Sequence, residues 1–231
     1  MRPFWIGPAA TPVLTLLVAG CAHSPAPTPS ATPARSSAHG TVVNPANIKR
    51  VVRDLPPNYE VTTAIPGGAA PRVIWSLAHD ASVIRVEPPQ CAALADPGSG
   101  RDQSAQGVSA SGTGGIVDAV VVALPGPVDL DHSLVAACAR WTMSDGHTTA
   151  GVRLADPPHI DGVETLGMVA DTKSSVESGT EIDSRIYTFT AYLGNYYAFT
   201  TLTTDPGSAL PALPPQFATD LLVKTVSTLR S

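Results

Sequence analysis

Residues 183–204, DSRIYTFTAYLGNYYAFTTLTT, predict the centre of the fold. Two runs rich in β-branched and aromatic residues flank Gly194-Asn195, a pair typical of a tight hairpin turn. We therefore expect antiparallel strands over 183–193 and 196–204. Alternate side chains of the first strand leave on opposite faces, one apolar and one more polar, and the polar set includes Thr188, Thr190 and Tyr192. This alternation predicts a sheet that is covered on one side and partly open on the other.

Further strands and helices are predicted on both sides of this hairpin. The expected strands cover 59–65, 104–110, 116–124, 141–144, 148–154 and 164–171, and Asp145-Gly146 marks a second hairpin. Segment 71–77 fits a short helix or a strand, and both remain open. The sum is an α+β fold, an antiparallel β-sheet flanked by helices in a single domain.

Three helices are indicated by capping residues and apolar spacing. Asn44-Pro45 can begin the first, whose apolar face is Ile48, Val51, Val52 and Leu55. Asp129 can cap a second that runs to about Arg140. Pro214-Pro215 opens the last, and its predicted buried stripe is Ala218, Leu222, Val226 and Leu229.

The N-terminus has the pattern of a bacterial lipoprotein leader. An apolar stretch from Phe4 to Val18 follows Arg2 and ends in the run Val18-Ala19-Gly20-Cys21, which resembles a lipobox. Pro8 and Pro12 interrupt the stretch, which is also too short to span a bilayer comfortably. The pattern predicts cleavage after residue 20 and a lipid on Cys21. Two alternatives are an uncleaved amphipathic anchor and a cleaved leader in which Cys21 is incidental.

Three segments follow from this interpretation. Residues 1–20 are the signal peptide, and residues 21–40 are an acylated cysteine followed by a tether rich in Pro, Ser, Thr and Ala. The folded domain is expected over 41–231. The location predicted for it is the extracytoplasmic face of the cell membrane, held there by the lipid on Cys21.

The other two cysteines, Cys91 and Cys138, are an even pair in an oxidising compartment, where a disulfide is the default. The alternative is two buried free thiols. A zinc site is not indicated, because no CxxC or Cys-His spacing accompanies them.

These cysteines also carry a family resemblance. A Pro88-Pro89-Gln90-Cys91 turn, a long gap, and then Cys138-Ala139-Arg140-Trp141 before antiparallel strands and a C-terminal helix resemble the mycobacterial sensor-domain lipoproteins. That family is similar to the extracellular sensor domain of the serine/threonine kinase PknH. The resemblance covers about 44–230 and implies a sensor-like domain without catalysis. No kinase domain accompanies it here, so signalling would work through a partner.

Composition and motifs exclude several functions. The net charge is −5, and removal of residues 1–20 takes away Arg2 and no acid, which leaves −6. An acidic chain without Lys/Arg clusters is a poor binder of nucleic acid. No GxSxG elbow or phosphate loop is present. Asp129, Asp131 and His132 are better explained by a helix cap than by a metal site, so no metal, cofactor or catalytic residue is expected.

The aromatic run from Tyr187 to Phe199 is the candidate recognition surface, with ordinary sheet packing as the alternative. If a groove exists, Thr188, Thr190 and Tyr192 are its predicted ligand-binding residues. We expect a non-enzymatic, lipid-anchored binding or sensor-like lipoprotein of the mycobacterial envelope, whose ligand or protein partner is unknown. A lipid or glycolipid carrier and an envelope hydrolase with an unrecognised site are the alternatives. A shallow polar cleft would favour the sensor-like lipoprotein, and a deep apolar pocket would favour the lipid carrier.

The anchor is tested by Cys21→Ala. This variant is expected to leave the membrane fraction or to accumulate as unprocessed precursor, because the acyl chain on Cys21 is the predicted attachment. Fractionation followed by immunoblotting measures this. Normal processing and full membrane retention of the variant would show that Cys21 is not the anchor.

Overall fold

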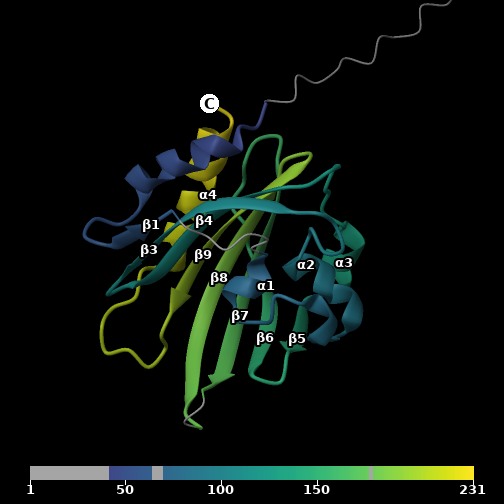
Figure 1. The fold of residues 1–231 in the computed structure, drawn as a ribbon, viewed down its shortest axis with the longest axis vertical. Helices are drawn as coiled ribbons and strands as arrows, with labels where there is room; N and C mark the ends of the chain where they lie inside the picture. The colour runs from purple at the N-terminus through teal and green to yellow at the C-terminus, as the bar shows by residue number, and fades with distance from the viewer. Residues whose placement is uncertain (1–41, 64–69, 177–178) are drawn as a thin grey trace, which may run out of the picture. The chain divides into compact units, whose positions relative to one another are not determined.

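One antiparallel sheet is the framework of the part of the chain that the computed structural model describes, residues 42–63, 70–176 and 179–231 (Figure 1). The predicted leader, the tether and Cys21 lie outside these residues. The strands are β1 (Glu60–Thr62), β2 (Arg85–Glu87), β3 (Ser104–Gly112), β4 (Gly115–Ala123), β5 (Arg140–Ser144), β6 (Thr148–Ala155), β7 (Glu164–Ser175), β8 (Glu181–Tyr192) and β9 (Tyr196–Thr204). Their order across the sheet is β1-β3-β4-β9-β8-β7-β6-β5-β2, so the last hairpin lies at the centre.

Both hairpins predicted from glycine turns are confirmed. Gly194 has a φ of 71° and Gly146 a φ of 91°, a region that glycine enters without steric cost. At the Gly194-Asn195 turn, the Leu193 amide donates to the Tyr196 carbonyl at 2.8 Å. The register then pairs Tyr192 with Tyr197, which fixes the side chains that each strand presents to either face of the sheet.

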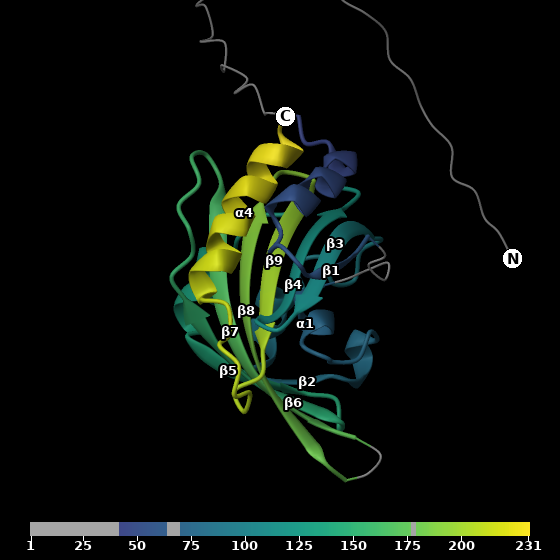
Figure 2. The same ribbon diagram turned by 90° about the vertical axis from the view of Figure 1, so that its left-hand side faces the viewer.

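Helices cover both faces of the sheet. The helices are η1 (Pro45–Asp54), α1 (Pro71–Ile74), η2 (Ala81–Val83), η3 (Pro89–Cys91), α2 (Ala92–Ala95), α3 (His132–Ala137) and α4 (Pro215–Leu229). Figure 2 shows α4 and η1 side by side on one face, which we call the helix face. The segments from α1 to α3 lie on the other, which we call the disulfide face.

The helix face is built from the two ends of the described chain. Asn44 caps η1 by accepting the Ala46 amide at 3.1 Å, and Ile48 and Val51 are buried against the sheet. The predicted stripe of α4 is buried at all its positions: Ala218, Leu222, Val226 and Leu229. The Asn44 amide donates to the Leu229 carbonyl at 2.8 Å, which ties the start of the domain to the end of α4.

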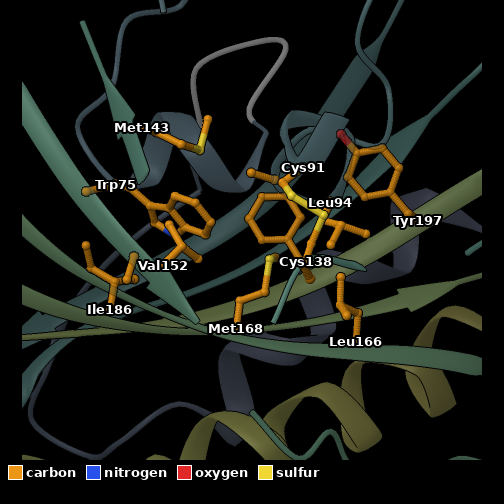
Figure 3. Packing of buried hydrophobic residues seen from close by; sticks show 14 of the residues in the cluster. Trp75, Cys91, Leu94, Cys138, Met143, Val152, Leu166, Met168, Ile186 and Tyr197 are labelled. Carbon is orange, nitrogen blue, oxygen red and sulfur yellow. A yellow bond between two sulfur atoms is a disulfide. The ribbon is translucent and has the colours of Figure 1, made fainter. Parts of the chain in front are cut away.

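The disulfide face holds the second core. Cys91 and Cys138 form a disulfide, as predicted, and both are fully buried. Figure 3 shows it in one apolar cluster with Trp75, Leu94 and Met168. The disulfide therefore joins η3 to the end of α3 and holds the two segments over the sheet.

Some predicted elements differ from the structure. The second helix is α3, which begins at His132 and not after Asp129, because the Asp131 carboxylate accepts the Ser133 and Leu134 amides at 2.8 and 3.3 Å. It ends at Ala137, and Arg140 already belongs to β5. The short edge strand β2 was not predicted. Segment 71–77 contains the helix α1, and the predicted strand at 59–65 is β1, with 64–65 outside the described residues.

Residues 41–231 form one compact unit that contains both cores and the disulfide, so the α+β single-domain prediction is confirmed. Since these interactions lie within the unit, we expect it to fold without the 40 residues before it.

The disulfide closes a separation of 47 residues. In the chain-entropy estimate a loop of this length stabilises the folded state by about 4 kcal/mol. Cys91→Ala/Cys138→Ala is therefore expected to lower the free energy of unfolding by up to about 4 kcal/mol, which urea denaturation of residues 41–231 measures. An unchanged unfolding midpoint would show that packing alone holds this layer.

Candidate functional site

The three predicted ligand-binding residues lie on the disulfide face of β8, and this face is not open. Thr188 and Thr190 are 0% exposed and Tyr192 is 8% exposed. The indole Nε1 of Trp75, which ends α1, donates to Thr188 Oγ1 at 3.0 Å. The predicted open face is therefore wrong, because the segments joined by the disulfide cover it.

Tyr192 also borders a small space. That space measures about 80 Å³ and lies between α2 and α3, where Asp129 and Asp131 also line it. A site for a small molecule has about 300–1,000 Å³, so this space is too small for one. Burial, and to a lesser degree the charge of Glu164, raise the pKa of the Tyr192 hydroxyl, which stays protonated. A ligand-binding role for Thr188, Thr190 and Tyr192 stays a prediction.

A row of polar side chains crosses the covered face in strand register. Thr62, Ser109, Asp118, Thr201 and Thr188 occupy matching positions on β1, β3, β4, β9 and β8. Asp118 is 5% exposed, and the Thr201 hydroxyl donates to its Oδ2 at 2.6 Å. Burial raises the pKa of Asp118, while hydrogen bonds from Ser109 and Thr201 oppose that rise. These hydrogen bonds thus partly compensate the energetic cost of burying a carboxyl group on the disulfide face, beneath the segments that the disulfide joins, which we call the disulfide layer.

An open cleft lies instead on the helix face, beyond the reach of α4. It measures about 420 Å³ and is bordered by β6, β7, β8 and Pro206. We call it the charged cleft, and its lining is Thr149, Gly151, Asp171, Thr172, Lys173, Asp183, Ser184, Arg185 and Pro206. The cleft lies on the same face of β8 as Phe189, whose side chain packs in the core beneath α4.

Two ion pairs in direct cross-strand register hold the charged groups of this cleft. Asp171 faces Arg185, with Oδ1 to Nε at 2.6 Å, and this carboxylate raises the pKa of the guanidinium. Lys173 faces Asp183, with Nζ to Oδ1 at 3.4 Å. These four side chains are 43–64% exposed. They therefore remain accessible to a ligand while the sheet fixes their positions.

Gly151 leaves the floor of the charged cleft bare. It stands in register between Thr142 and Asp171. A Cβ placed on Gly151 would meet only the Asp171 carbonyl oxygen, at 3.9 Å. Packing therefore does not require glycine here, and the missing side chain keeps the cleft open.

A larger open cleft of about 720 Å³ lies where the β6–β7 loop crosses the end of α4. It includes Ile160, Val223, Arg230, and the pair of His159 and Asp161. The side chains of that pair are 90% and 101% exposed, so the surrounding protein does little to fix them. We therefore take the charged cleft, built on paired strands, as the candidate functional site.

Sequence reasoning missed the charged cleft, although a signal was present. Asp171-x-Lys173 and Asp183-x-Arg185 place opposite charges at the same spacing on two strands that flank one turn. Such spacing puts each pair on one face of the sheet. The pairing register, which makes Asp171 face Arg185, comes only from the structure.

Among the described residues, no group of three or more His, Cys, Asp or Glu side chains is placed to bind a metal ion. Asp131 caps α3, and His132 contacts Glu164 at 2.6 Å, from Nε2 to Oε1, on the surface. Within the described ranges, no helix is long and apolar enough to cross a membrane.

These features define a class: a disulfide-containing α+β domain with one covered sheet face and a charged cleft on the other. The chain belongs to the family of the domain of unknown function DUF5642, which matches residues 44–230. A comparison with curated proteins gives no match.

Two solved structures from mycobacteria are similar. An uncharacterised protein of Mycobacterium smegmatis, the Rv0999 ortholog, aligns with a TM-score of 0.60 at 19% identity, over 82% of this chain and 98% of that one. The extracellular domain of PknH from Mycobacterium tuberculosis aligns with a TM-score of 0.42 at 13% identity, over 82% of this chain and 92% of that one. The resemblance to a mycobacterial family is confirmed, at the level of the fold, by the first.

The buried carboxyl predicts a pH dependence of stability. Because the pKa of Asp118 is raised in the folded state, the folded protein binds a proton on this carboxyl group more tightly than the unfolded chain does. The contribution of Asp118 to stability is therefore fully present below the unfolded pKa and is lost as the pH rises through the folded pKa. The variant Asp118→Asn lacks this pH-dependent contribution, because asparagine does not titrate. Relative to the wild type, its free energy of unfolding should increase with pH over that window, as urea titrations from about pH 3 to about pH 7 measure. A constant difference would show that Asp118 titrates alike in both states.

Proposed function

We propose that the protein is a non-enzymatic, lipid-anchored receptor domain of the cell envelope that binds a polar ligand in the charged cleft. The observation that carries this proposal is the row of exposed, sheet-fixed charges around the bare floor at Gly151. Carboxylates and a guanidinium held in place offer charge-assisted hydrogen bonds to a ligand. Hydroxyl-rich envelope saccharides are the ligand class that we propose.

Two further observations support the proposed location. The lipobox-like run ending in Cys21 supports export and acylation, and the proposed tether is residues 21–40. The disulfide between Cys91 and Cys138 supports an oxidising, extracytoplasmic compartment. The sequence resemblance to sensor-domain lipoproteins agrees with a receptor that passes its signal to a partner.

The shape of the cavities distinguishes this proposal from a lipid carrier. The charged cleft is open and is lined by charged side chains, which suits a polar ligand better than an acyl chain. The spaces beneath the disulfide layer measure about 80 Å³ next to Tyr192 and about 30 Å³ next to Arg72. Neither could enclose an acyl chain of a membrane lipid.

Gly151→Val tests the cleft. Valine suits a strand, and its Cβ would meet only the Asp171 carbonyl oxygen, at 3.9 Å, so the fold should be retained while the side chain fills the cleft floor. Binding of water-soluble mycobacterial cell-wall polysaccharide, measured by calorimetry on residues 41–231, should weaken at least about tenfold, or about 1.4 kcal/mol.

Thr142→Val is the matched control. Thr142 is exposed and pairs with Gly151 on the neighbouring strand, but it does not line the cleft. It should bind as the wild type does. Equal affinity of a folded Gly151→Val variant would contradict the cleft, and an absence of binding by the wild type would contradict the saccharide class.

A further inference from the structure

The outer surface of η1 concentrates positive charge on an acidic protein. Lys49, Arg50 and Arg53, which we call the basic strip, are all exposed. The neighbouring carboxylate, Asp54, is 20% exposed and lies 3.6 Å from Arg53 and 3.7 Å from Lys224 of α4. Within η1, three cations thus accompany one carboxylate.

The geometry of η1 explains why these cations gather. In a 3₁₀ helix, residues i and i+3 lie above one another. Ile48 and Val51 therefore form the buried column, while Arg50 and Arg53 share an outer column. Two like charges at this spacing repel each other, and the fold leaves them on the surface.

Exposed apolar side chains accompany the basic strip. Val52 is 37% exposed and belongs to the same column as Lys49, and Val42, just before η1, is 83% exposed. A surface that combines cations with exposed apolar groups is typical of segments that lie on an anionic membrane.

The position of the strip in the chain points to the same occupant. Residues 21–40 separate Cys21 from the domain, and 20 residues span at most about 70 Å when fully extended. The Asn44 amide binds the Leu229 carbonyl, so this connection meets the domain beside η1. In a protein held to the membrane by a lipid on Cys21, the basic strip would remain within reach of the lipid headgroups.

We propose that the basic strip docks on anionic lipid headgroups of the membrane. The proposal rests on the proposed anchor for its setting, but the interaction itself is a property of the domain. Both views place η1 and the β7–β8 hairpin at opposite ends of the sheet (Figures 1 and 2). Docking through η1 therefore turns the charged cleft away from the membrane and toward the envelope.

The test is sedimentation of residues 41–231 with vesicles, at low ionic strength and again at physiological salt. Vesicles of phosphatidylglycerol and phosphatidylcholine should bind the domain, and pure phosphatidylcholine should not. Added salt should weaken binding, because exposed charges are screened beyond about 8 Å at physiological ionic strength. The variant Lys49→Gln/Arg50→Gln/Arg53→Gln should bind about 100-fold less, about fivefold for each cation.

The control variant is Arg85→Gln/Arg140→Gln/Arg153→Gln, which removes the same charge from β2, β5 and β6. It should bind vesicles as the wild type does. Equal loss of vesicle binding in both variants would show a response to net charge alone and would overturn the proposal. Wild-type binding that is absent, or that does not depend on headgroup charge, would overturn it as well. Gly151→Val should still bind vesicles. The test of vesicle binding by the basic strip is therefore independent of the test of saccharide binding in the charged cleft.

Discussion

The half of β8 from Ile186 to Tyr192 needs cover on both of its faces, and the rest of the domain is arranged to supply it. The strand lies inside the sheet between β7 and β9, so its side chains leave alternately in two directions. Phe189 and Ala191 enter the core beneath α4 and η1, while Ile186 and Tyr192 enter the core beneath the disulfide layer. Apolar area on both faces stabilises the fold only if two separate layers exclude water from it.

The two layers are held in different ways. The helix face is covered by η1 and α4, which come from opposite ends of the domain and join where Asn44 binds Leu229. The disulfide face is covered by short helices that could not hold their positions by local hydrogen bonds alone. Besides apolar packing, its links are the disulfide, the Trp75–Thr188 hydrogen bond, and the buried pair of Arg72 and Asp96 at 2.9 Å.

This division also locates function. The covered face contains the buried Asp118 row, and its spaces beside Tyr192 and Arg72 measure about 80 and 30 Å³. The helix face is covered only in part, because α4 packs on β4, β8 and β9. The charges of β7 and β8 beyond α4 form the open cleft, and the basic strip lies at the other end of the sheet. In the proposed receptor, one end of the domain contacts lipid and the other contacts ligand.

The sequence by itself determined what depends on local pattern: the hairpins at Gly146 and Gly194, the buried stripe of α4 and the cysteine pair, because turn chemistry, periodicity and an even cysteine count act over short ranges or by simple pairing. Only the tertiary structure decided which part of β8 is open. The segments that bury Thr188 lie far from it in the chain, and the register that sets Asp171 against Arg185 is fixed between strands. No local pattern specifies where a distant segment packs, so the covered face and the cleft follow from the complete fold.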